Sequence, residues 1–322
     1  MSDEKFKIDL LNQAINRGAV ILAKVTSGLV PFDAQAGGIS SHKKTFLRLE
    51  PSYVLKPLRL DHRKVREVGF YDLVNYRLDL ADRSNQRLSN QGDLLAWLST
   101  FVPKYYGVAK VKGDQLDASA AGGDEDAEYI ILEDLTRKYS KPCIIDVKMG
   151  TRSFEPDATD EKKLNEAGKY PQQADFGLRI VAIRVYNPSN ANADDSGYVY
   201  YSKHYGRSLS SRCKLKEAFR AFVGVHGTGE PISNVLKQLE EIKAWFLKND
   251  SFCFYSSSVI IVYEGDDKCK ESSPPIVKMI DFARVRRQRG GDEGYLLGLN
   301  TLVTLLHEIA SESIYATSQN DV

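Results

Sequence analysis

Cysteine and histidine are scarce in this sequence, which excludes the common disulfide and metal frameworks. There are only five histidines, and no two of the four cysteines form a CxxC pair. The cysteines are Cys143, Cys213, Cys253 and Cys269. Because a structural zinc site needs closely spaced Cys and His ligands, we expect none. Scattered single cysteines are typical of a reducing compartment, so the sequence favours an intracellular protein.

Long apolar runs and a net charge of either sign are also missing. No segment approaches the ~20 apolar residues of a membrane-spanning helix, and the first residues, MSDEKFK, contain no apolar signal core. The formal net charge is +1, so no overall field attracts nucleic acid or membrane. Any anion site must therefore be a local cluster of basic side chains. We expect a monomer of the cytoplasm or nucleus that does not bind nucleic acid directly.

The length and composition are those of a globular protein with two lobes. The chain has 322 residues, a length that suggests two lobes and not one small core. With 42% hydrophobic and 27% charged residues, its composition is that of a globular protein. We divide it into an N-terminal extension (1–27), an N-lobe (28–135) and a C-lobe (136–322). Residues 113–127 are small and acidic, and we expect them to form a solvated loop.

Apolar periodicity predicts strands and helices in both lobes. In the first part we expect a short helix and connector over 5–25, strands within 28–45 and at 46–49, 53–58, 105–111 and 129–135, a helix over 61–80 and a short apolar segment at 94–101. In the second part we expect strands at 142–150, 176–186, 198–201, 258–263 and 276–283, and helices at 160–167, 212–223, 232–248 and 294–311. This mixture predicts an α+β fold.

The segment from Pro142 to Gly150, PCIIDVKMG, contains an acid and a base two residues apart. Since side chains alternate along a strand, Asp146 and Lys148 point to the same face, and Ile145 and Val147 point to the other. A carboxylate and an ammonium on one face suit phosphoryl transfer, which needs a metal or hydroxyl ligand and a cation for the moving phosphate. The alternative is an ordinary surface ion pair on an edge strand.

Two further acidic positions fit the same chemistry. Asp281 directly follows an apolar strand, where the metal-binding acids of phosphotransferases are often found, although a turn or helix-capping aspartate is an equal alternative. Glu67 lies eleven residues after Lys56 and could pair with it, so that the lysine would contact nucleotide phosphates. The alternative for this second pair is a surface salt bridge.

The nine-residue segment matches the PxxxDxKxG signature of the inositol phosphate kinase family, and further motifs of that family follow along residues 30–310. The segments that resemble it are Val54-Leu55-Lys56, Arg66–Tyr71, the hinge Leu132–Thr136, His204–Leu209, Ser257–Ile260, Met279–Ala283 and Asp292–Leu299. Ser257-Ser258-Val259-Ile260 departs conservatively from Ser-Ser-Leu-Leu. Motifs in this order make a chance match improbable.

Within the family the sequence is most similar to the multikinase branch. Lys169-Tyr170-Pro171 with Gly177, and an Ile280–Ala283 segment that does not end in Asp-Phe-Gly, carry this resemblance. The inositol hexakisphosphate kinases, which make diphosphoinositol phosphates, are the nearest competitor. The trisphosphate 3-kinases fit less well, because no long insert follows Lys162-Lys163. The alternative of another class is a kinase-fold scaffold in transcription or signalling complexes.

The resemblance implies a two-lobed, protein-kinase-like fold with an antiparallel N-lobe sheet, a larger α+β C-lobe, and ATP between them. It implies an ATP- and Mg²⁺-dependent kinase of inositol tris- and tetrakisphosphate. The implied nucleotide and metal residues are Lys56 on the ATP phosphates, Glu67 orienting Lys56, backbone groups of Glu133 and Leu135 on adenine, Asp134 or Asp146 on the ribose, and Asp281 with Ser258 on Mg²⁺.

For the inositol phosphate, the resemblance implies that Lys148 contacts the transferred phosphate and the attacking hydroxyl. It also implies, less strongly, that Asp146 acts as a general base. Further substrate contacts are expected from Lys162, Asn165 (or Glu166) and Lys169 on one helix face, from Arg207 in a cluster with Lys203 and Arg212, and from Arg284. Arg284 stands where several relatives have histidine, and Glu166 where they have a neutral amide. A further hypothesis is that the same pocket accepts a phosphoinositide headgroup at a membrane surface, to which the net charge of +1 lends no support.

Overall fold

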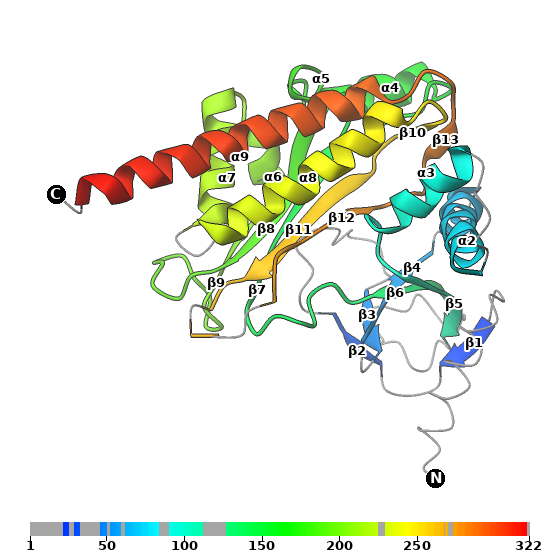
Figure 1. The fold of residues 1–322 in the computed structure, drawn as a ribbon, viewed down its shortest axis with the longest axis horizontal. Helices are drawn as coiled ribbons and strands as arrows, with labels where there is room; N and C mark the ends of the chain where they lie inside the picture. Colours follow the sequence, from blue (N-terminus) through cyan, green and yellow to red (C-terminus); the bar gives the residue numbers. More distant parts are fainter. Residues whose placement is uncertain are drawn as a thin grey trace, which may run out of the picture. The chain divides into compact units, whose positions relative to one another are not determined.

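The computed structural model describes residues 22–25, 29–32, 46–49, 52–58, 62–83, 90–111, 127–224, 229–266, 268–269 and 273–320. The chain divides into two compact units, Met1–Asp134 and Leu135–Val322 (Figure 1). The expected acidic loop lies almost entirely outside these ranges, as do residues 5–21 of the expected N-terminal helix. In the described ranges, no helix is both long enough and apolar enough to cross a bilayer.

The N-terminal unit contains one sheet, with strand order β1-β5-β6-β4-β3-β2. Its strands are β1 (Leu22–Val25), β2 (Leu29–Pro31), β3 (Leu47–Leu49), β4 (Tyr53–Pro57), β5 (Tyr105–Val111) and β6 (Ala127–Glu133), and its described helices are α2 (His62–Arg83) and α3 (Asn90–Ser99). All pairings are antiparallel except that of β1 with β5. The prediction of helix or connector over 5–25 was therefore wrong for residues 22–25, where the open edge of β5 supplies backbone partners that outweigh local propensity.

Strand β4 and helix α2 place a lysine and a glutamate toward each other. Leu55 is fully buried in the sheet's core, so Lys56 points to the opposite face. On α2, Glu67 lies one turn before the buried Tyr71 and therefore on the helix's buried stripe. A carboxylate in that position needs a partner, and this requirement selects the pair described below.

The C-terminal unit is built on a five-stranded antiparallel sheet with strand order β12-β11-β7-β8-β9. Its strands are β7 (Pro142–Met149), β8 (Leu178–Tyr186), β9 (Tyr198–Tyr201), β11 (Ser258–Glu264) and β12 (Ile276–Ile280), and β10 (Phe252–Phe254) pairs separately with β13 (Val285–Arg287). The sequence predicted all five strands of the larger sheet. It missed β10 and β13, because strands of three residues are too short to show a period.

Helices cover the sheet of the C-terminal unit (Figure 1). They are α4 (Asp160–Gly168), α5 (Gln173–Phe176), α6 (Lys203–Ser208), α7 (Arg212–Val223), α8 (Glu230–Lys248) and α9 (Glu293–Asn320). Helices α7 and α9 pack against β7 and β8, while α8 packs against α9 and β12. The apolar stripe predicted for 232–248 is the buried face of α8. The sequence missed the short helices α5 and α6, and α9 extends beyond the predicted residue 311.

An aromatic cluster fixes the end of β12. Phe282 is fully buried and packs against Phe254, with ring centroids 6.1 Å apart. Phe254 in turn contacts Trp245 of α8 and Tyr295 of α9, at 5.8 and 6.0 Å. Because these large side chains are closely packed, the residue before Phe282, Asp281, is held in a defined backbone position.

Two glycines bring α9 against the start of β8. A Cβ atom added to Gly298 would lie 2.1 Å from the carbonyl oxygen of Gly177, and one added to Gly177 would lie 2.4 Å from the nitrogen of Gly298. The same Gly177 carbonyl accepts a hydrogen bond of 2.8 Å from the N–H of Gly150. This contact joins the end of β7, the start of β8 and the second turn of α9, and no larger residue fits there.

We expect Gly298→Ala to lower the free energy of unfolding of the C-terminal unit by about 3 kcal/mol, because backbone must move to admit the methyl group. Intrinsic helix propensity alone would favour alanine by about 1 kcal/mol, so the sign of the change tests the contact. Thermal unfolding measures it. The matched control is Gly168→Ala in α4, where a Cβ atom meets nothing within 4 Å and stability is expected to stay equal or rise. Equal stability in both variants would contradict the prediction.

Candidate active site

Strand β7 carries the acid and base of the signature at the centre of the sheet. It is third among five strands and pairs with β11 and β8 on its two sides. Ile145 and Val147 are fully buried, and Asp146 and Lys148 alternate with them at half-buried positions. The alternative of a surface ion pair on an edge strand is therefore wrong.

A row of polar residues crosses three strands beside Lys148. In the register of the sheet, Lys148 lies opposite Ser258 of β11 and opposite Arg179 of β8, and directly opposed residues share a face. Ser258 Oγ and Arg179 Nη1 are both buried, and neither has a hydrogen-bond partner in the described part of the chain. Buried polar atoms are normally satisfied, so this pair points to a ligand.

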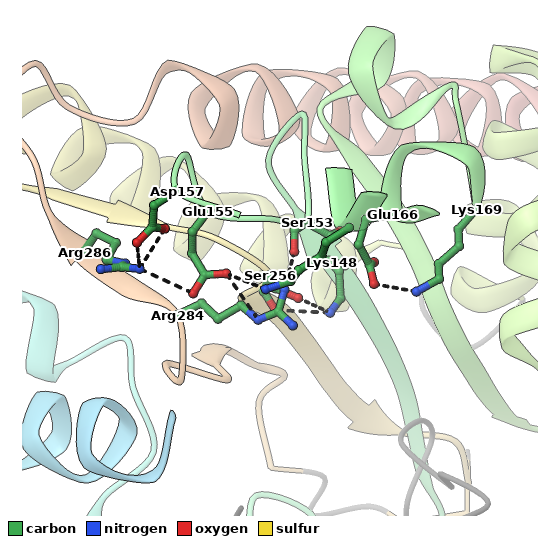
Figure 2. A network of polar contacts seen from close by, with 10 residues as sticks. Lys148, Ser153, Glu155, Asp157, Glu166, Lys169, Ser256, Arg284 and Arg286 are labelled. Atoms are coloured by element: carbon green, nitrogen blue, oxygen red, sulfur yellow. Dashed lines mark hydrogen bonds and ion pairs between the residues drawn. The ribbon is translucent and has the colours of Figure 1, made fainter. Parts of the chain in front are cut away.

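Lys148 is held by the backbone and side chain of one serine. Its Nζ donates to Ser256 Oγ at 2.8 Å and to the Ser256 carbonyl at 3.2 Å (Figure 2). Burial lowers the pKa of Lys148, while Asp281 and Asp146 oppose that change. A cation held in a poorly hydrated site interacts strongly with an incoming anion.

The backbone is strained at two places around this lysine. Ser256 has φ of 62° and Asp281 has φ of 67°, and these are the only two non-glycine residues with positive φ that the structure describes. The two segments adjoin, because Ser258 pairs with Ile280. Such conformations cost of order 1–3 kcal/mol each and concentrate at functional sites. Here the buried Phe282 and the sheet hold them in place.

Oxygen atoms from β11 and the end of β12 could hold a small divalent cation. Asp281 supplies a carboxylate and Ser258 a hydroxyl with no described partner. In the described ranges no cluster of three or more His, Cys, Asp or Glu residues forms a full protein cage for a metal. Mg²⁺ commonly uses one or two carboxylates and completes its shell with water and phosphate oxygens. The residues present fit that kind of site.

Helix α4 carries the predicted basic segment on a mostly exposed element. Thr159 caps it by accepting from the N–H of Lys162 at 3.3 Å. Lys169 pairs with Glu166 (Figure 2), and the Asn165 side chain is exposed and makes no hydrogen bond to the described residues. Lys163 pairs with Asp160 at 3.2 Å. The predicted helix is confirmed, and its basic residues have acidic partners.

Arg284 lies just after β12, and residues of the segment that follows β7 hold its side chain. Its Nη1 donates to the carbonyl of Ser153 at 2.6 Å, and its Nε lies 3.8 Å from Glu155 Oε2 (Figure 2). It also influences the pKa of Lys148 electrostatically. Arg284 and Lys148 therefore belong to one charged cluster.

The second predicted cluster, Lys203 with Arg207 and Arg212, is not formed. Burial lowers the pKa of Arg179, and the nearby charge of Arg207 on α6 lowers it further. Lys203 is exposed, and Arg212 pairs with Glu308 of α9. A break at residues 209–211 separates α6 from α7 and sends Arg212 to a different surface, so only Arg207 joins the site.

In the N-terminal unit, Lys56 and Glu67 form the predicted pair. Lys56 Nζ lies 2.6 Å from Glu67 Oε1, and the two side chains are 18% and 6% exposed. The alternative of a surface salt bridge is therefore wrong. A lysine aimed by a buried carboxylate can contact phosphate oxygens as a fixed cation.

The hinge residues at the end of β6 are partly used within the N-terminal unit. The Glu133 N–H donates to the carbonyl of Lys104 at 2.9 Å. This N–H, one of the backbone groups assigned to adenine, therefore already has a partner. The Asp134 carboxylate accepts from Arg48 Nε at 3.0 Å and is buried. Leu135, the first residue of the second unit, is buried.

Sequence reasoning missed three residues that contribute to the site. Arg179 was available as a signal, since an arginine inside an otherwise apolar strand needs an anion or a partner. Ser256 was hidden in a run of three serines, and only the turn before β11, where Ser256 has positive φ, brings it to Lys148. Glu155 gave little local signal, because two of its three basic neighbours, Arg284 and Arg286, come from a distant part of the sequence.

Comparison with known proteins places this geometry in one family. The family model described as inositol polyphosphate kinase matches residues 129–307. A mouse inositol polyphosphate multikinase is 32% identical over 249 residues, which cover 76% of this chain and 56% of that protein. A human inositol hexakisphosphate kinase 2 is 33% identical over 229 residues, covering 58% and 52%. The chain thus spans about half the length of the curated relatives that it matches.

A solved structure supports the fold. The inositol phosphate multikinase of S. cerevisiae, crystallised with ADP and Mn²⁺, aligns with a TM-score of 0.57 over 80% of this chain and 99% of that one, at 21% identity. The predicted α+β kinase fold is therefore confirmed. The family model matches residues 129–307, which is more than half of the sequence. This chain therefore belongs to the inositol polyphosphate kinase family.

Proposed function

We propose that this protein is an ATP- and Mg²⁺-dependent inositol polyphosphate kinase of the multikinase type, which phosphorylates ring hydroxyls of inositol tris- and tetrakisphosphate. The observation that carries the proposal is the row Ser258, Lys148 and Arg179, in which the half-buried Lys148 is flanked by buried polar atoms with no partner in the described chain. A multiply charged phosphate would satisfy both basic residues, and an oxygen-bound cation would satisfy the serine.

For the nucleotide, Lys56 would contact the ATP phosphates and Glu67 would keep the lysine in place. Asp134 is committed to Arg48, so of the two alternatives for the ribose hydroxyls we assign Asp146. Asp281 and Ser258 would hold Mg²⁺, which neutralises charge on the phosphates when it is bound. These groups position the phosphates, which is most of what phosphoryl transfer requires of a protein.

For the acceptor, Lys148 would lie at the transferred phosphate and the attacking hydroxyl. Lys162, Lys169, Arg207 and Arg284 would contact the other phosphates of the inositol ring, joined by Arg179. Glu166 bonds Lys169 and would accept from a free ring hydroxyl or repel a phosphate at that place. The choice of ring positions would therefore be set on α4.

A product assay tests the proposed function. Purified protein is incubated with Mg²⁺-ATP and, separately, with inositol tris-, tetrakis- and hexakisphosphate, and the products are separated by charge. We expect the trisphosphate to be converted stepwise toward the pentakisphosphate. No product from any of the three would refute a kinase of inositol phosphates. A parallel reaction with vesicles containing phosphoinositide tests whether the same site accepts the lipid headgroup.

The second candidate function is that of an inositol hexakisphosphate kinase. The similarity to the human hexakisphosphate kinase, which extends over 229 residues, favours this alternative specifically. In the same assay it predicts a diphosphoinositol product from the hexakisphosphate and no reaction of the trisphosphate. That result would replace the multikinase proposal while leaving the assigned residues unchanged.

The pH dependence of the reaction should report on Lys148. Burial lowers the pKa of Lys148 from its ordinary value of 10.5, and the charged form is lost as the pH rises through that lowered pKa. We therefore expect kcat/KM to fall on the alkaline side earlier than an ordinary lysine would allow. In Lys148→Arg, whose side chain stays protonated, this fall should vanish at a lower overall rate. An unchanged alkaline limb, measured from about pH 7 to 10, would contradict the assignment.

A further inference from the structure

The carboxylate of Glu155 lies where Lys162 of α4 meets Arg284 and Arg286 from the segment after β12; the two arginines are labelled in Figure 2. Glu155 belongs to the connection between β7 and α4, and its side chain is only 5% exposed. Lys162 Nζ lies 3.4 Å and Arg284 Nε 3.8 Å from its Oε2, and Arg286 Nη2 lies 3.8 Å from its Oε1. Burial raises the pKa of Glu155, but Arg284 and Lys162 outweigh it, so the pKa lies below its ordinary value. The carboxylate is therefore charged at neutral pH.

The three cations are not equivalent. Arg286 Nη2 donates to both carboxylate oxygens of Asp157, at 2.9 and 2.8 Å, so Arg286 has a closer anion than Glu155. Lys162 has Glu155 as its only acidic partner within the described residues. One carboxylate oxygen, Oε2, thus serves the side chains of Lys162 and Arg284 together.

Arg284 is held at two of its three nitrogens. Nε faces Glu155, and Nη1 donates to the carbonyl of Ser153. Since the guanidinium is planar and rigid, two fixed nitrogens set the direction of the third. Nη2 has no acceptor in the part of the chain that the structure describes, and it is the group left to meet a phosphate oxygen.

We propose that Glu155 is a positioning residue for the inositol phosphate: it holds Lys162 and Arg284 in one fixed arrangement, so that both cations are ordered before the substrate arrives. The inference rests on the proposed function, which assigns substrate phosphates to these two cations. Long basic side chains lose conformational freedom when they bind, and ordering them beforehand improves affinity. Glu155 would not touch the substrate.

The direction of the effect separates positioning from simple electrostatics. Glu155→Gln removes one negative charge close to a site for a polyanion, and on charge alone the substrate should bind more tightly. If Glu155 acts by holding Lys162 and Arg284, its loss should weaken binding in spite of that gain. The KM for the inositol phosphate therefore moves in opposite directions under the two explanations.

We expect Glu155→Gln to raise the KM for inositol trisphosphate about 10-fold, with kcat and the KM for ATP changed less than about 2-fold, the pattern of lost uniform binding. Glu155→Asp, which keeps the charge, should recover most of the affinity. An unchanged or lower KM for the trisphosphate would overturn the proposal. A fall in kcat, a rise in both KM values and a lower unfolding temperature together would also overturn it, because they indicate general damage.

Two comparisons sharpen the experiment. Asp157→Asn removes a neighbouring carboxylate that pairs with Arg286, and its KM should remain within about 2-fold of wild type. In Glu155→Gln, the further change Arg284→Gln should raise the KM much less than it does in wild type, since the arginine has already lost its fixed position. Equal effects of Arg284→Gln in both backgrounds would contradict positioning.

A substrate-free measurement distinguishes this inference from the proposed function. The Nε–H signal of Arg284 in the nuclear magnetic resonance spectrum should report a rigid side chain in wild type and a mobile one in Glu155→Gln. If wild type phosphorylates no inositol phosphate, the proposed function fails, and this signal still decides whether Glu155 orders Arg284. Equal mobility of Arg284 in the two proteins would overturn the inference even if the kinase reaction is found.

Discussion

Lys148→Met is expected to lower kcat for inositol trisphosphate by about 10³-fold or more, with a much smaller change in the KM for ATP. Methionine keeps the length of the side chain and removes its charge. Loss of a single preorganised group that stabilises a developing anion costs about 10²–10³ in kcat, and phosphoryl transfer depends almost entirely on such groups. Lys148 is a half-buried cation on a central strand, held by Ser256, so it should belong to the high end of this range.

Stability measurements control this variant. Removing a desolvated cation eliminates the cost of burying it, but it also removes a positive charge near Asp146 and Asp281. Because these effects oppose each other, we expect the free energy of unfolding to change by less than about 1 kcal/mol, or about 4 °C in unfolding temperature. Lys243→Met, at a surface pair with Glu240 on α8, is the matched substitution and should keep wild-type kinetics. Substantial turnover by Lys148→Met would remove this lysine from the site.

Asp281→Asn is the second variant with a large expected effect, a loss of about 10³-fold in kcat together with a higher Mg²⁺ requirement. Asparagine suits the test because Asp and Asn are the non-glycine residues that best tolerate positive φ, and Asp281 has φ of 67°. The backbone can thus stay in place while the negative charge that would hold the cation is lost. Initial rates measured against Mg²⁺ concentration separate the two changes.

Asp195→Asn in the exposed loop before β9 controls for charge and should leave the rate and its Mg²⁺ dependence unchanged. A wild-type response to Mg²⁺ in Asp281→Asn would show that the metal is held elsewhere. The same variant also addresses the scaffold alternative. If cells that carry only Asp281→Asn lose inositol phosphate products but keep every other function of the protein, the fold serves an additional non-catalytic role.

Most of the fold of the C-terminal unit was accessible from the sequence, because its strands and long helices have clear apolar periods. The strand that carries Asp146 and Lys148 and the stripe of α8 are examples. The failures were short or pairing-dependent elements. Strand β1 exists because β5 offers an open edge, which no local pattern of residues reveals.

The candidate site was only partly predictable, for a related reason. Lys56, Glu67 and Lys148 were accessible because each breaks an apolar pattern, and a charge in such a place demands a partner. The partners were not accessible when they came from distant segments. Ser256 meets Lys148 through the turn before β11, 108 positions along the sequence, and Glu155 meets Arg284 across 129 positions of sequence.

The central position of β7 also predicts where the molecule resists hydrogen exchange. Its backbone pairs with β11 over 142–148 and with β8 over 144–149, so its amides should exchange only when the whole unit unfolds. Helix α4 buries no residue and should open far more readily. The residues proposed for catalysis on β7 and those proposed for substrate recognition on α4 thus lie in regions of very different local stability. A change of substrate preference can therefore arise on α4 with little disturbance of the strand that carries Asp146 and Lys148.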